Sequence, residues 1–224
     1  MKLLRHGPKG QEKPGLLDAE GGLRDLSGEI TDIDAAALSP ESLRRLSELD
    51  PAALPRVEAP VRLGPCVGEV GTFLAIGLNY HDHALEAGQP IPEEPILFMK
   101  AAGCVSGPND DVLLPPGSEK LDWEVELGVV IGAACRHVPE ATALEHVAGY
   151  CVVNDVSERA YQMERGGQWV KGKSYDSFGP IGPYLVTRDE VPDPQALEMF
   201  LEVNGERMQS GSTGTVIFPV GEIV

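Results

Sequence analysis

Short apolar runs separated by glycine and proline limit most strongly what this chain can fold into. Its 224 residues include 26 glycines and 19 prolines, above the usual shares of about 7% and 5%. These residues are spread along the chain, so turns follow one another at short intervals. Strands are predicted at TFLAIGL, PILFMK, DVLLP, DWEVELGVVIG, GYCVVNDVS, PYLVT and MFLEVNGERMQ.

The connections between these runs are also short. Asn204-Gly205 lies between two alternating runs and predicts a type I′ hairpin. Only brief helices fit between the other strands, at HDHALEA, ATALEHVAG and ERAYQME. The sequence therefore predicts a β-rich α+β fold, a twisted β-sandwich or barrel-like sheet, rather than a doubly wound parallel sheet.

The first part of the chain has its own pattern. We expect residues 1–62 to form a small N-terminal α/β domain ending in a linker, and residues 63–224 to form the second domain. Ser39 followed by Pro40 is typical of a helix N-cap and a first-turn proline. The linker is indicated by Pro51, Pro55 and Pro60.

Charge and cysteine usage exclude several classes of function. Lys and Arg total 18 against 35 Asp and Glu, for a formal net charge of -17. Because so acidic a surface repels nucleic acid and anionic membranes, we expect neither as a partner. No apolar run has the length of a signal peptide or a membrane span, which favours a cytoplasmic protein. The four cysteines form no C-x-x-C pair, which predicts buried, reduced thiols.

One stretch, GQWVKGKS, matches the P-loop pattern through Gly167, Gly172, Lys173 and Ser174. A phosphate-binding loop needs a strand before it and a helix after it. Here a helix-like segment precedes the loop, and two prolines follow it. We therefore interpret the match as accidental and expect another role for Lys173.

The strand pattern LDWEVELGVVIG carries two acidic side chains. Alternation places Glu124 and Glu126 on one face, roughly 7 Å apart at ~3.3 Å per residue. If that face is solvated, they are ordinary polar positions. If it is buried, a divalent cation such as Mg²⁺, Mn²⁺ or Ca²⁺ is the simplest way to neutralise them.

Asp155 is a candidate third ligand, because it follows the apolar run YCVV. Carboxylates are seldom placed at the end of a buried strand without a partner. The alternative is that Asp155 caps the following SERAYQ helix.

A proton acceptor is predicted in GLNYHDHALEAG. Asn79 is expected to cap a short helix that ends at Gly88. His83 and Glu86 are then three residues apart on one helical face, and a carboxylate beside imidazole makes it a better base toward water. The alternative is an ordinary surface pair.

Together and in this order, GLNYHDHALEAG, LDWEVELGVVIG, NDVSERAYQ and VKGKSYDSFGP resemble the fumarylacetoacetate hydrolase family. The resemblance implies Mg²⁺ or Mn²⁺ bound by Glu124, Glu126 and Asp155. It also implies that a dyad of His83 and Glu86 activates water.

The resemblance runs from about Thr72 to the end of the chain and assigns substrate and enolate stabilisation to Arg159, Gln162 and Lys173. It implies a homodimer that hydrolyses a C–C bond in a 2,4-diketo acid to give pyruvate and a carboxylic acid. LRHGPKGQEKPGLLD further resembles the bacterial 2,4-diketo-3-deoxy-L-rhamnonate or L-fuconate hydrolase branch. Family members continue past the position of Val224, so we expect a longer natural protein.

Two alternatives remain open at this stage. An isomerase, a lyase or an oxaloacetate-type decarboxylase would use the same scaffold and cation without a water-activating base. A non-catalytic binding module would instead use the carboxylates as part of a solvated acidic face.

Overall fold

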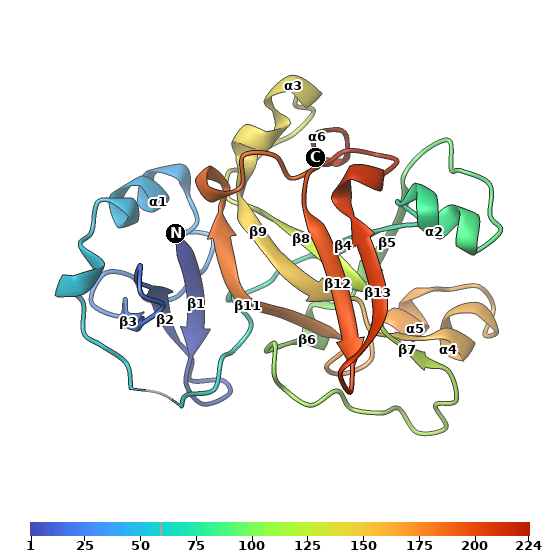
Figure 1. Ribbon diagram of the computed structural model, residues 1–224, viewed down its shortest axis with the longest axis horizontal. Coiled ribbons are helices and arrows are strands. Elements are labelled where there is room, and N and C mark those ends of the chain that lie inside the picture. Colours follow the sequence, from blue (N-terminus) through green and yellow to red (C-terminus); the bar gives the residue numbers. More distant parts are fainter. Residues whose placement is uncertain (59) are drawn as a thin grey trace.

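The computed structural model describes residues 1–58 and 60–224 and is built around one large sheet (Figure 1). Its seven strands follow the order β3-β2-β1-β11-β9-β8, with β6 beside β11. Neighbouring strands are antiparallel except β6 and β11, which are parallel. The strands of this sheet are β1 (Lys2–His6), β2 (Lys13–Leu17), β3 (Leu23–Asp25), β6 (Val105–Ser106), β8 (Val125–Ile131), β9 (Val147–Asn154) and β11 (Gly179–Thr187).

Three two-stranded sheets accompany the large one. They are β4 (Phe73–Gly77) with β5 (Ile96–Lys100), β7 (Leu121–Asp122) with β10 (Ser157–Glu158), and β12 (Glu198–Val203) with β13 (Glu206–Ser212). In the β12–β13 hairpin, Asn204 and Gly205 have φ angles of 54° and 82°. Positive φ at both positions confirms the predicted type I′ turn.

The helices are short, as the sequence predicts. They are α1 (Pro40–Ser47), α2 (His81–Glu86), α3 (Glu140–Ala143), α4 (Arg159–Met163), α5 (Val170–Lys173) and α6 (Val220–Ile223). Single 3₁₀ turns occur at Pro51–Ala53, Ala102–Cys104, Leu144–His146, Arg188–Glu190 and Thr213–Thr215. None of the helices in the described part of the chain has the length and apolar character needed to cross a membrane.

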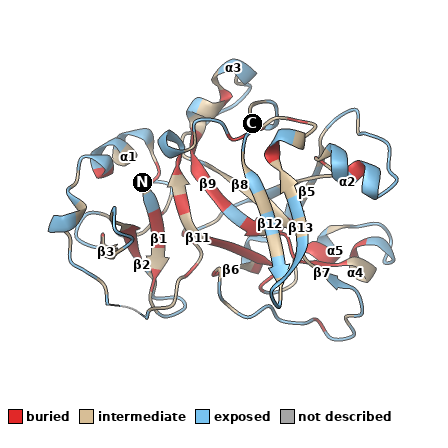
Figure 2. Ribbon diagram, in the orientation of Figure 1, coloured by how far each residue is buried: buried red, intermediate tan, exposed pale blue. Residues whose placement is uncertain are grey.

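The predicted β-rich α+β fold is confirmed. Strands dominate, and neighbouring strands of the large sheet are antiparallel except β6 and β11. Buried residues concentrate in β1, β9 and β11, whereas α2 and much of the β12–β13 hairpin are exposed (Figure 2). The apolar core therefore lies against the large sheet, and the elements around it carry exposed side chains.

The N-terminal strands extend this sheet. β1 pairs with β11, and Leu3 belongs to the same apolar core as Val153 and Ile181. Helix α1 begins as predicted, with Ser39 as N-cap accepting from the Ser42 backbone N–H. The domain boundary at residue 62 stays a prediction, while the hydrogen-bonded sheet is continuous across the two parts.

Charged side chains also join the two parts. Arg62 donates from Nε and Nη2 to the Asp110 carboxylate at 2.7 and 2.6 Å and from Nη1 to Glu12 at 2.8 Å. The hydrogen bonds that Arg62 donates to Asp110 are the first cause that raises the pKa of Arg62. In return, the bonds from Arg62 lower the pKa of Asp110 below its ordinary value.

Two sequence predictions are wrong at this level. DVLLP forms no strand: Leu113 and Leu114 are exposed, and the Leu113 backbone N–H donates to the Ser177 hydroxyl. Pro115 and Pro116 follow directly, and proline lacks the N–H that a strand ladder needs. Among the cysteines, Cys135 is exposed, whereas the other three are buried; all four are free thiols, as predicted.

Candidate active site

A cavity of about 1600 Å³ lies between β4, β5, β8, the β12–β13 hairpin, α2 and α5. Every side chain that the sequence singled out for chemistry lines it. These are His83, Glu86, Glu124, Glu126, Asp155, Arg159, Gln162 and Lys173. Segments more than 80 residues apart in the chain thus contribute to one site.

Lys173 is the cation at the centre of this group. It is the last residue of α5 and only 3% exposed. Its Nζ donates to Glu124 Oε2 at 2.8 Å and to Asp155 Oδ2 at 2.7 Å, and it lies 5.3 Å from the centre of the Phe98 ring. Helix α4 precedes this segment and strand β11 follows it, so the P-loop interpretation is excluded, as predicted.

Asp155 is held from two sides. It follows the end of β9 and is 5% exposed. Lys100 Nζ donates to Oδ1 at 2.5 Å, while Lys173 occupies Oδ2. Burial alone would raise the pKa of Asp155, but the two ammonium groups lower it below its ordinary value. The capping alternative is excluded, because the N-cap of α4 is Glu158, which accepts from the Ala160 N–H.

Glu124 lies outside the strand in which it was predicted. The run LDWEVELGVVIG is interrupted after Asp122 and resumes at Val125, so β7 pairs with β10 and β8 with β9. The interruption arises where Asp155 donates its backbone N–H to the Glu124 carbonyl at 2.9 Å. Glu124 and Glu126 still line one cavity, although a continuous alternating strand does not carry them.

Glu126, on β8, is the carboxylate with the least compensation. The Tyr80 hydroxyl donates to its Oε2 at 3.0 Å. Burial raises the pKa of Glu126 to about 8, and the charges of Glu124 and Asp155 act in the same direction. The site therefore stabilises less negative charge than its carboxylates would carry if all were ionised.

Arg159 and Gln162 form the wall beside Glu124. Arg159, the first residue of α4, donates from Nε to Asp122 at 2.8 Å and from Nη2 to Glu124. Its Nη1 donates to the Gln162 Oε1 at 3.0 Å, and Gln162 is buried. Both side chains line the cavity, as required for contact with a bound molecule.

His83 and Glu86 line the cavity from α2, and both are exposed. No hydrogen bond or ion pair joins their side chains in the described part of the chain, so the dyad stays a prediction. Asn79 does not cap this helix, because its side chain bonds both backbone groups of Phe218, at 2.9 and 3.1 Å. Gly88, with φ +62°, ends the helix as predicted.

The carboxylates are suitable ligands for a divalent cation, but their side chains are not arranged around a common ion position. As the side chains lie, no three His, Cys, Asp or Glu groups among residues 1–58 and 60–224 are placed to share a metal ion. Lys173 occupies an oxygen of both Glu124 and Asp155 instead. Three carboxylates remain suitable donors for Mg²⁺ or Mn²⁺. Burial raises the pKa of Glu126, and the charges of Glu124 and Asp155 act in the same direction.

Two polar residues of the site were missed from the sequence. Lys100 is the last residue of the apolar strand β5, and its position after ILFM is the same signal that identified Asp155. Tyr80, directly before α2, binds Glu126 but carries no charge. No pattern in the sequence distinguishes it from any other tyrosine at a helix start.

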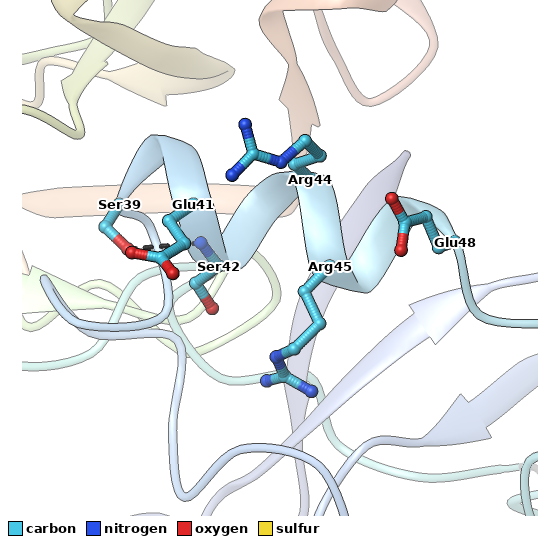
Figure 3. Close-up of a pocket in the computed structure, with 6 residues that line it drawn as sticks. All are labelled: Ser39, Glu41, Ser42, Arg44, Arg45 and Glu48. Carbon is cyan, nitrogen blue, oxygen red and sulfur yellow. Dashed lines mark hydrogen bonds between the residues drawn. The ribbon is translucent and has the colours of Figure 1, made fainter.

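A second hollow, of about 350 Å³, lies on the surface of α1 (Figure 3). Ser39, Glu41, Ser42, Arg44, Arg45 and Glu48 line it. None of these lines the large cavity, and Arg45 is paired with Glu29. The chemistry predicted from the sequence therefore belongs to the large cavity alone.

Comparison with known proteins places the chain among enzymes. The sequence profile of the C-terminal domain of fumarylacetoacetate hydrolase matches residues 72–224. The chain belongs to the fumarylacetoacetate hydrolase family. A Burkholderia multivorans protein named only as a hydrolase is 62% identical over 224 residues, which are all of this chain and 79% of the relative.

Solved structures of the family share the fold. Fumarylacetoacetate hydrolase from Exiguobacterium antarcticum is 33% identical, with a TM-score of 0.84 over this whole chain and 79% of its own. Maleylpyruvate hydrolase from Sphingobium, in complex with manganese and pyruvate, is 26% identical, with a TM-score of 0.82 over 100% and 81%. A 5-carboxymethyl-2-hydroxymuconate delta-isomerase from Mycobacterium smegmatis is 28% identical, with a TM-score of 0.74 over 100% and 79%.

Proposed function

We propose that the protein hydrolyses a C–C bond in a 2,4-diketo acid of the acylpyruvate type, giving pyruvate and a carboxylic acid. The observation that supports it best is the grouping of Glu124, Glu126, Asp155 and Lys173 in one cavity that His83 also lines. The family includes a maleylpyruvate hydrolase with manganese and pyruvate bound. A 2,4-diketo-3-deoxy sugar acid is the substrate that we propose within this class.

We propose Glu124, Glu126 and Asp155 as the residues that hold Mg²⁺ or Mn²⁺. Such an ion, when bound, polarises the oxygens of a 2-oxo acid and stabilises the charge that develops on them. Because Lys173 bonds to both Glu124 and Asp155, ion binding competes with its ammonium for the carboxylate oxygens. A displaced Lys173 ammonium is then free to bind substrate.

The remaining roles belong to other side chains that line the cavity. His83, oriented by Glu86, takes a proton from the water that attacks the C4 carbonyl. Lys173 donates a hydrogen bond to the oxygen that becomes negative as the C3–C4 bond breaks. Arg159 and Gln162 orient the substrate, and the planar guanidinium suits a carboxylate.

The experiment is a screen of 2,4-dioxo acids against the full-length protein with Mg²⁺ or Mn²⁺. Turnover is measured as loss of diketone absorbance and as release of pyruvate. We expect turnover that EDTA abolishes and that either metal restores. Turnover that survives complete metal removal would disprove the metal-dependent reaction. Sedimentation of the same preparation tests the homodimer that we propose from the family.

A second candidate is an isomerase or a decarboxylase on the same scaffold, since the family includes a delta-isomerase. These reactions need no water-activating base. Oxaloacetate distinguishes the decarboxylase, because CO₂ release from it without cleavage of any acylpyruvate would favour that activity. A double-bond shift in the substrate without pyruvate release would favour the isomerase.

A non-catalytic acidic module predicts no metal site at all. Calorimetry with Mn²⁺ on the parent and on Glu126→Gln decides this question. We expect binding by the parent and clearly weaker binding by the variant, because the amide removes one anionic ligand. Equal, negligible heats from both proteins would favour the module.

A further inference from the structure

Lys100 is a buried cation to which the proposed reaction assigns no role. It ends β5 and is 1% exposed. Burying an ammonium is costly unless each of its protons finds an acceptor. Its Nζ has three: Asp155 Oδ1 at 2.5 Å, the Val156 carbonyl at 3.3 Å and the Lys173 carbonyl.

Two of these acceptors belong to the residues on which the site depends. Lys100 binds one oxygen of Asp155, and Lys173 Nζ binds the other. Lys100 also binds the backbone of Lys173. One ammonium group therefore contacts both the Asp155 carboxylate and the backbone of Lys173.

Helix α5 needs such an anchor because it has only four residues. Helices this short are not stable without tertiary contacts. Besides Lys100, β5 provides the Phe98 ring near Lys173 Nζ, and the next residue, Ala101, donates its N–H to the Ser174 hydroxyl at 2.8 Å. Among these contacts, only Lys100 binds both α5 and Asp155.

We propose that Lys100 is a positioning residue for this site. Its buried ammonium holds Asp155 with Oδ2 directed into the cavity, and it holds α5 so that the Lys173 ammonium reaches the same place. The kinetic part of the proposal rests on the proposed hydrolase function, whereas the structural part does not.

The test compares the full-length parent with Lys100→Met, which keeps the volume but lacks the charge and the donors. Lys120→Met is the matched control, because Lys120 is half-exposed and its ammonium pairs with Glu164 on the surface. We expect Lys100→Met to weaken Mn²⁺ binding about 10- to 100-fold. Losing a nearby positive charge would by itself tighten cation binding, so weaker binding reports lost positioning.

Hydrogen exchange supplies a readout that needs neither metal nor substrate. In Lys100→Met we expect faster amide exchange confined to residues 169–174 and to the neighbourhood of Asp155. With an acylpyruvate substrate, kcat falls about 100-fold and KM changes less than about threefold. Lys120→Met behaves as the parent in all three measurements.

Parent-like Mn²⁺ affinity and exchange in Lys100→Met would overturn the proposal, and so would exchange that rises uniformly over the chain. If Lys100→Met does not fold, Lys100→Gln replaces it in the same measurements, because glutamine keeps an N–H donor. A parent that binds Mn²⁺ but cleaves no 2,4-dioxo acid refutes the hydrolase function alone, because binding and exchange still test Lys100.

Discussion

At the scale of single residues, the role of His83 has the least structural support among the predicted site residues. His83 is exposed on α2 and forms no bond to Glu86 in the described structure. General-base assistance contributes about 10² to 10⁴ in rate. We expect His83→Ala to lower kcat by that factor and to melt at the parent temperature, because an exposed side chain contributes little to stability.

His81→Ala is the control for this change. His81 is also exposed on α2, two residues earlier, but it does not line the cavity. Both variants are compared in the acylpyruvate assay. Parent-like kcat in His83→Ala would remove the histidine from the mechanism and favour a reaction that needs no base.

At the scale of elements, Asn79 ties the start of α2 to the end of the chain, because its side chain binds both backbone groups of Phe218. Asn79→Ala leaves a buried N–H and a buried carbonyl without partners, at a cost of about 1–3 kcal/mol for each such group. We expect lower stability in urea together with lower kcat, since the wall that carries His83 is no longer held. Asn109→Ala, at an exposed turn position, should leave both unchanged; if the two variants unfold alike, Asn79 is not the anchor.

At the scale of the whole molecule, Asp110 and Arg62 join the first part of the chain to the rest. The bonds from Arg62 lower the pKa of Asp110 in the folded protein. A depressed carboxyl pKa stabilises the folded state above the unfolded pKa of about 3.9, and this stability is lost as the pH falls through the folded pKa. Asp110→Asn should therefore cost about 1.5–3 kcal/mol at pH 7.

The measurement is urea unfolding of parent and Asp110→Asn between pH 7 and pH 3. We expect the difference in unfolding free energy to begin to shrink below about pH 4, where Asp110 in the unfolded chain binds a proton that its lowered pKa keeps off the folded protein. A constant difference over this range would show that the ion pair contributes nothing and that only the shape of the side chain matters.

The sequence by itself determined the strand-rich class, the Asn204-Gly205 turn, the Ser39 cap and the set of side chains that meet in the cavity. The class, the turn and the cap follow from apolar runs and from the φ and capping preferences of single residues, which are local properties. Among the cavity residues, the carboxylates and His83 with Glu86 were indicated by their own sequence patterns, whereas Arg159, Gln162 and Lys173 were assigned by the resemblance to the fumarylacetoacetate hydrolase family. Lys100 carried such a signal too, at the end of ILFMK.

Only the tertiary structure decided how these groups interact. It interrupts the predicted strand between Asp122 and Val125, pairs Asn79 with Phe218, and surrounds Lys173 with Glu124 and Asp155. Each of these contacts joins residues far apart in the chain, and their energies depend on burial and on neighbouring charges. No local pattern contains that information, because desolvation and pairing arise only when distant segments pack together.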